Sequence, residues 1–160
     1  MTRMLQALAQ PDQPVATYRA LEAEAQSHIG IRLFTLMTLD HETGLARRCY
    51  SNVPEAYPPS GAKEITPNAW TKTVLDRQEV FVANTLDEIA AVFPDHELIQ
   101  SLGCESCLNI PILVGGEVIG TLNCLHEAGH YTAERVAKAH QLKEPGALAL
   151  LLALINRDEQ

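Results

Sequence analysis

The sequence predicts an α+β fold, in which a mostly antiparallel sheet carries the terminal helices on one face and a long loop with short helices on the other. The expected order supports this class: a helix, two strands, a loop, helices around one strand, a hairpin and a final helix. The hairpin is the strongest signal, because the apolar runs 108–114 and 118–125 meet at Gly115-Gly116, and tight primed turns need positive φ at both central residues. Both runs are apolar at nearly every position, as expected of central strands covered on both faces.

The N-terminal third is expected to form a helix and two paired strands. Apolar residues at helical spacing predict a helix over 15–26, with Pro14 just inside its start and Gly30 just past its end. Strands are expected over 31–39 and 45–51, joined by a polar turn that allows antiparallel pairing.

The middle of the chain alternates loops with short elements. The segment 52–67 is rich in proline, and a loop of this length in a compact domain is more often functional than idle. A helix is expected over 68–77 and a short strand over 79–83. Residues 84–87 are typical of a helix start, and another short helix is expected over 94–102.

The final helix is expected to begin after the cap Thr132 and to break or kink near Pro145-Gly146 before continuing to Ile155. Its last turns are apolar all round, with one stripe of Leu148, Leu151, Leu152 and Ile155 and further leucines at Leu150 and Leu154. A helix that is apolar on every side must be covered on more than its sheet-facing side. The sequence therefore predicts a homodimer through the terminal helices.

Composition limits the classes of function. The 160 residues are expected to form one domain, 1–160, with its core over about 15–155. A net charge of −8 argues against nucleic-acid binding, and we interpret Arg47-Arg48 as a solvated strand end. The longest apolar run, 147–155, is too short to span a membrane. Four cysteines without an export signal indicate free thiols and a cytoplasmic location.

The hairpin motif PIL-V-GG-EVIGTLNCL resembles that of the GAF domain family, through its strand proline, glycine turn and I-G-T-L run. The loop 56–63, followed by Trp70, is similar to that of small stand-alone bacterial GAF proteins. The resemblance covers about 15–155 and implies a profilin-like, six-stranded sheet whose ligand pocket lies on the face away from the terminal helices. No kinase, cyclase, phosphodiesterase or helix-turn-helix motif accompanies it. The resemblance implies a non-catalytic sensor or regulatory module that binds a small molecule and signals to a protein effector.

Two asparagines, Asn109 and Asn123, interrupt the apolar hairpin strands, and buried amides need hydrogen-bond partners. An unbroken ladder that pairs Val114 with Glu117 would place Cys107 opposite Cys124. Pro111 cannot donate to the ladder and favours a bulge. We expect a bulge that places Cys107, Asn109 and Asn123 on the pocket face and Cys124 and His126 on the other.

Four further residues are expected at the pocket walls. Lys63 could bind an anionic group of the ligand, or it could be a solvated loop lysine. Trp70 could line the pocket or anchor the long loop to the core. Tyr50 and Tyr57 are weaker candidates, because buried tyrosines often pack with only the hydroxyl in water.

Two motifs suggest metal or thiol chemistry. His126-Glu127-Ala128-Gly129-His130 matches H-E-x-x-H, which binds zinc when both histidines lie one helical turn apart, but this segment is expected to be a loop. Cys104 and Cys107 form a C-x-x-C pair that could bind a metal or act as a redox switch with Cys124. The alternative favoured by burial is structural thiols.

One enzymatic GAF family, the free methionine-(R)-sulfoxide reductases, offers a direct comparison. Alignment on the strand proline puts its pocket carboxylates at Cys107, Asn123 and Leu125, and its nucleophilic cysteine near Gln100. None of these residues matches. The sequence therefore favours a sensor without catalytic activity, and leaves a thiol-dependent enzyme or redox sensor, and a structural dimerisation module, as alternatives.

Overall fold

The computed structural model describes residues 2–59 and 61–158. Its centre is a six-stranded antiparallel sheet in the order β3-β2-β1-β6-β5-β4. The strands are β1 (Leu33–Asp40), β2 (Leu45–Ser51), β3 (Lys63–Glu64), β4 (Phe81–Ala83), β5 (Ser106–Val114) and β6 (Glu117–His126). Within the described ranges, no helix is long and apolar enough to cross a membrane.

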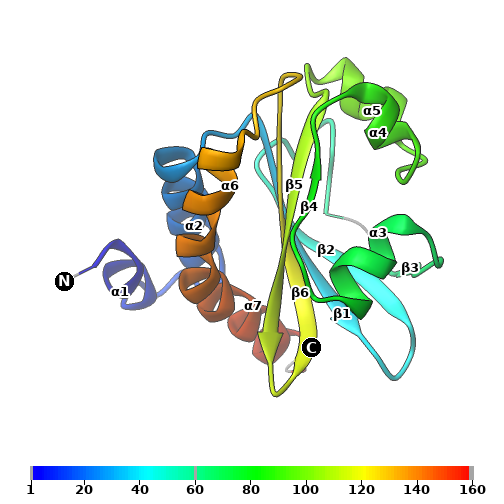
Figure 1. Ribbon diagram of the computed structural model, residues 1–160. Coiled ribbons are helices and arrows are strands. Elements are labelled where there is room, and N and C mark those ends of the chain that lie inside the picture. Colours follow the sequence, from blue (N-terminus) through cyan, green and yellow to red (C-terminus); the bar gives the residue numbers. More distant parts are fainter. Residues whose placement is uncertain (1, 60, 159–160) are drawn as a thin grey trace.

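Helices cover the two faces of the sheet unequally (Figure 1). The terminal helices lie on one face: α1 (Arg3–Leu8), α2 (Val15–His28), α6 (Ala133–Ala139) and α7 (Lys143–Asp158). Short elements lie on the other: α3 (Ala69–Thr71), a π-helical turn (Lys72–Asp76), α4 (Leu86–Ala90) and α5 (His96–Ser101). The larger apolar core lies between the sheet and the terminal helices. The α+β fold, the six-stranded sheet and the distribution of its helices are as predicted.

The central hairpin has the predicted turn and the predicted bulge. Gly115 and Gly116 adopt φ of 63° and 83°, and Val114 pairs with Glu117 beside them. The register shifts between Ile112 and Leu113, where Ile119 of β6 is left without a partner. Beyond this bulge the parity of the strands changes.

The bulge places the two asparagines opposite each other, with Asn109 paired to Asn123 and Cys107 paired to Leu125. Cys124 packs in the core on the helix side of the sheet, among residues such as Leu108 and Tyr131. The sequence-based register is therefore confirmed. Pro111 fits because β4 pairs only with 107–109, so that side of β5 has no strand partner at the proline.

The break in the C-terminal helical segment lies earlier than predicted. A 3-10 turn over His140–Leu142 separates α6 from α7, and α7 continues without interruption through Pro145 and Gly146. Pro145 stands in the first turn of α7, where no intrahelical backbone donor is required. Gly146 is needed for close packing, because a Cβ built on it would lie 2.8 Å from Cδ1 of Leu122.

Several other helices and strands also differ from the sequence-based prediction. The helix α1 was not predicted, although Met4 buries its side chain in the main core. The predicted helix over 68–77 is a short α-helix that continues as a π-helical turn, and the loop 52–67 contributes the two-residue strand β3. The strand expected over 79–83 is reduced to Phe81–Ala83.

Candidate ligand-binding cavity

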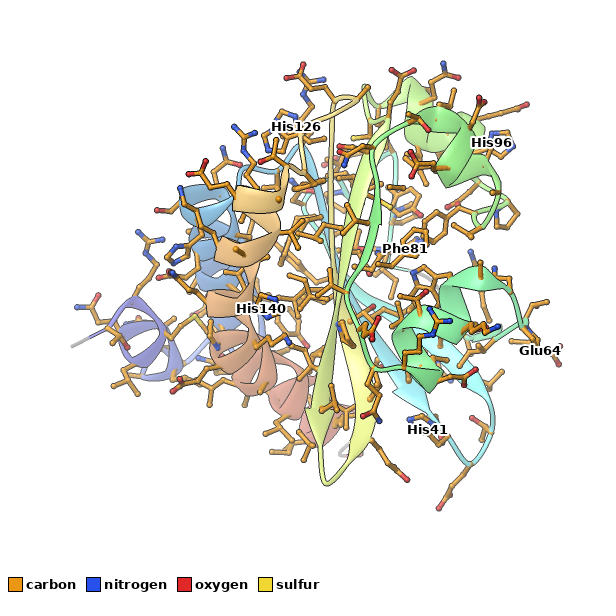
Figure 2. All side chains as sticks on the ribbon, in the orientation of Figure 1. His41, Glu64, Phe81, His96, His126 and His140 are labelled. Carbon is orange, nitrogen blue, oxygen red and sulfur yellow. The ribbon has the colours of Figure 1, made fainter. Side chains whose placement is uncertain are left out.

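A cavity of about 270 Å³ lies between the sheet and the layer of short elements opposite the terminal helices. Its apolar lining includes Met37, Leu39, Ile65, Val92, Phe93, Ile99 and Leu125. Phe81, which points to this side of the sheet (Figure 2), packs edge-on against Phe93 with ring centroids 6.3 Å apart. Among the polar residues that line the cavity, two groups are connected by side-chain contacts, one at the floor and one at the wall beside β2.

A chain of side-chain hydrogen bonds crosses the floor from α3 to β1. The indole Nε1–H of Trp70 donates to Oδ1 of Asn109 (3.0 Å), and Nδ2 of Asn109 donates to Oδ1 of Asn123 (2.8 Å). Nδ2 of Asn123 donates in turn to Oγ1 of Thr35 (3.1 Å), while Oγ1 of Thr121 donates to Oδ1 of Asn123 (2.9 Å). Trp70, Asn109, Thr35 and Thr121 are buried, so this network joins the loop side of the cavity to three strands.

Trp70 determines the direction of the whole chain of bonds. An indole nitrogen can only donate, so Asn109 must turn its carbonyl oxygen toward Trp70 and its NH₂ toward Asn123. Asn123 must then present its oxygen to Asn109 and its NH₂ to Thr35. Because burial makes each unpaired polar group costly, the network holds one arrangement of amides.

The wall beside β2 is built around Tyr57. Its ring packs against the guanidinium of Arg48, with Cζ 3.8 Å from the ring centroid, and its hydroxyl donates to Oδ2 of Asp95 (2.5 Å). Nη1 of Arg48 also donates to the carbonyl of Pro58 (2.9 Å). These contacts tie the loop 52–59 to β2 on one side and to the start of α5 on the other, across the cavity.

Comparison with known proteins identifies the family. A family model described as "GAF domain" matches residues 14–150. The chain belongs to the GAF domain family. No curated protein sequence matches it significantly.

Solved structures share this GAF fold at low sequence identity. The GAF domain of an Acinetobacter phosphoenolpyruvate-protein phosphotransferase is similar with a TM-score of 0.71 and 12% identity, over 98% of this chain and 93% of that one. The GAF domain of a Bacillus halodurans two-component sensor histidine kinase gives 0.67 and 15%, over 92% and 99%. The second GAF domain of DevS from Mycobacterium smegmatis gives 0.62 and 19%, over 92% and 100%.

The GAF fold brings most of the predicted site residues to the cavity. Cys107, Asn109, Asn123, Trp70, Lys63 and Tyr57 all line it. Lys63 is exposed, and Trp70 combines both roles considered for it, since it lines the cavity and anchors the loop through its bond to Asn109. Binding of a ligand by these residues stays a prediction.

Tyr50 is the exception and has to be removed from the candidate site. Its hydroxyl donates to Oε1 of Glu22 on α2 (2.8 Å), and its ring packs near Tyr18 and Phe34 on the helix side. The cause is an irregularity in the pairing of β1 with β2, where Leu36 pairs with Tyr50 but Met37 pairs with Arg48. Simple alternation from Arg48 would have kept Tyr50 on the cavity face.

Sequence reasoning missed Arg48, Asp95 and Thr35. Arg48 was interpreted as a solvated strand end, yet it is only partly exposed and lines the cavity. Alternation from Ala46 could have suggested its orientation, since both residues line the cavity. No local signal indicates Asp95, because its role depends on a tyrosine distant in the sequence.

The cysteines are poorly suited to thiol chemistry. All four are free, and Cys104, Cys107 and Cys124 are completely buried. Burial raises the pKa of Cys107 to about 12 and also raises the pKa of Cys104 and Cys124. These thiols are therefore protonated near neutral pH, and the thiolate is the form that attacks or binds metals.

The reductase comparison gains no support from the cavity. Cys107, Asn123 and Leu125 do line it, but none of them carries a carboxylate. Gln100 lies on α5, is exposed and is not part of the lining.

The H-E-x-x-H segment forms a loop between β6 and α6, as predicted, with His126 on the helix side of the sheet (Figure 2). Ligand atoms of His126, Glu127 and His130 lie within 4.8 Å of one another. The two imidazoles are stacked, however, with centroids 3.6 Å apart and planes inclined by 6°. A metal lies close to the plane of each imidazole that binds it, so two parallel stacked rings cannot share one. Nδ1 of His126 is also occupied by the N–H of Glu127 (2.8 Å).

Proposed function

We propose that this GAF domain is a non-catalytic regulatory module that binds a small molecule in the cavity and transmits its occupancy to a protein partner in the cytoplasm. The observation that carries the proposal is the mostly apolar cavity with its ordered polar floor. Ligand sites are typically concave, mostly apolar and provided with a few placed polar groups. The GAF domain of a two-component sensor histidine kinase is among the structures with the same fold.

A route for transmission supports the regulatory role. The floor connects Trp70 to β1 and β6, and β1 and β6 contact α7 on the opposite face of the sheet. A ligand that displaces Trp70 or the loop would therefore act on strands that support the terminal helices.

The proposed output surface is a homodimer formed through the terminal helices. Leu148, Leu151 and Ile155 of α7 are exposed, with 36%, 39% and 56% of their surfaces accessible. Leu5 of α1 and Val15 of α2 are exposed on the same layer. Covering such residues between two copies would bury apolar surface, and a symmetric dimer is the commonest oligomer.

A cavity-filling variant tests the proposed function. The purified protein is screened against a small-molecule extract, with binding followed by Trp70 emission and by native mass spectrometry. Val92→Phe should occlude the cavity and abolish binding, because Val92 lines it. Val114→Phe adds the same volume at an exposed position beside the hairpin turn, outside the cavity and not on a terminal helix, and should bind normally. Retained binding by Val92→Phe would place the ligand elsewhere.

A further inference from the structure

The floor of the cavity offers donors to a ligand and no amide acceptors. Oδ1 of Asn109 accepts from Trp70 and, at 3.8 Å, from Sγ of Cys107. Oδ1 of Asn123 accepts from both Asn109 and Thr121. Each amide oxygen has two acceptor positions, so both oxygens are fully used.

Three hydrogens at the floor have no acceptor within the described residues. Asn109 and Asn123 each use only one of the two hydrogens on Nδ2, and the hydroxyl of Thr35 accepts from Asn123 without donating to any described residue. A ligand that contacts this floor must therefore present oxygen or nitrogen acceptors. A free amide can both donate and accept, but the bonds that the asparagines make with each other, with Trp70 and with Thr121 occupy their oxygens and leave only donors.

Arg48 contributes a positive charge that forms no ion pair with the other described residues. Its guanidinium packs on the ring of Tyr57 and donates one bond to the carbonyl of Pro58. The ion pairs of the described residues do not include Arg48, and Asp95 accepts a hydrogen bond from Tyr57 instead. The guanidinium is only partly exposed and lines the cavity, and its planar set of donors matches a carboxylate.

We infer that the ligand is a small monocarboxylate with an apolar body, whose carboxylate pairs with Arg48 and whose oxygen acceptors meet the donors of Asn109, Asn123 and Thr35. This inference rests on the small-molecule function proposed above. The cavity lining carries two cations, Arg48 and the exposed Lys63, and two carboxylates, Asp95 and Glu64. Because the two carboxylates would repel a dianion such as phosphate, a single negative charge fits best. The many apolar lining residues fit the body of the molecule, and the volume of about 270 Å³ requires it to be small.

The test compares aliphatic and aromatic monocarboxylic acids with their primary amides, which keep shape and the carbonyl acceptor but lose the charge. Trp70 emission and saturation-transfer NMR measure affinity in the parent protein and in three variants. Arg48→Gln removes the charge, Arg48→Lys keeps the charge without the planar donors, and Arg47→Gln removes the neighbouring arginine, which is exposed and does not line the cavity. Far-UV circular dichroism and thermal unfolding confirm that each variant is folded.

Acids are expected to bind at least about tenfold more tightly than their amides. Arg48→Gln should abolish that preference, Arg48→Lys should retain part of it, and Arg47→Gln should leave it unchanged. Amides that bind as tightly as acids, or a preference that survives in Arg48→Gln, would overturn the carboxylate inference while leaving the small-molecule function in place. If no compound of either series binds the folded parent, the carboxylate inference is contradicted, while the small-molecule function is judged separately by the extract screen with Val92→Phe.

Discussion

Asn109 and Asn123 lie directly opposite each other on β5 and β6, and a 2.8 Å hydrogen bond joins their side-chain amides. This pair is the centre of the cavity floor, because Trp70 donates to one amide and Thr35 accepts from the other. Its existence depends on the bulge at Ile119, without which the asparagines would point to opposite faces of the sheet.

Removing one asparagine should destabilise the protein by leaving its partners unpaired. In Asn123→Leu, the donors of Asn109 and Thr121 lose their acceptor, and each buried unsatisfied group costs about 1–3 kcal/mol. The free energy of unfolding, measured in urea, should fall accordingly, and ligand binding should be lost. The double variant Asn109→Leu/Asn123→Leu should cost less than the sum of the two single variants. Strict additivity would contradict a coupled pair.

Gly146→Ala should lower stability even though alanine is the better helix former. The added Cβ would lie 2.8 Å from Cδ1 of Leu122 and 3.1 Å from Cδ1 of Ile112. Overpacking of this kind costs about 1–3 kcal/mol, more than the gain of about 0.5–1 kcal/mol in helix propensity. Thermal unfolding measures the loss, and Leu122→Val in the Gly146→Ala background should recover part of it. A stabilised Gly146→Ala would show that α7 does not pack this closely on β6.

His126 should make folding less favourable in mild acid. Burial, His130 and Arg32 lower its pKa, outweighing the nearby Glu127, and Arg135 acts in the same direction as Arg32. In mild acid the imidazole of His126 is therefore protonated more readily in the unfolded chain than in the folded protein. The free energy of unfolding should fall as the pH drops below about 6.5.

The contribution of His126 is measured with the variant His126→Asn, because Oδ1 of the asparagine can still accept from the N–H of Glu127. Urea unfolding between pH 8 and pH 5, a range of about three units around the ordinary histidine pKa, should show a flatter pH profile for this variant. His140→Asn, at an exposed histidine in the 3-10 turn, is the matched control. Identical pH profiles for His126→Asn and the parent protein would show that His126 does not cause the loss of stability in mild acid.

Cys107 and Cys124 should not form a disulfide bond with each other. They belong to the cores on opposite faces of the sheet, and a disulfide needs Cβ atoms about 3.5–4.5 Å apart. Mild oxidation should leave both thiols titratable after unfolding. Because burial raises both pKa values, thiol reagents should react slowly with the folded protein and rapidly once it unfolds. Recovery of a Cys107–Cys124 cross-linked peptide would contradict the observed register.

The proposed dimer can be tested with charged substitutions at matched exposed leucines. Leu151→Glu on α7 should shift the protein to a monomer in sedimentation equilibrium, because it introduces a charge into the proposed interface. Leu113→Glu near the hairpin tip has a similar exposure, 40% against 39%, and should leave the dimer intact. A parent protein that is monomeric at micromolar concentration would eliminate the dimer.

Local patterns in the sequence were enough for the fold and for part of the cavity. The Gly115-Gly116 turn, the apolar strands around it and the proline at 111 together predicted the hairpin, its bulge and the shared face of Cys107, Asn109 and Asn123. These features depend on residues close together in the chain, where backbone geometry and strand alternation act directly. The homodimer, by contrast, stays a prediction.

Contacts between segments distant in the sequence determined the remaining features of the cavity. Tyr50 leaves the cavity because the pairing of β1 with β2 is irregular, and Arg48 enters it because Tyr57 and Pro58 hold the guanidinium. The direction of the amide bonds follows from Trp70, which lies 39 residues before Asn109 in the chain. The residue types at these positions carry no local signal of their partners, because hydrogen bonds and ring packing of this kind exist only after the chain has folded.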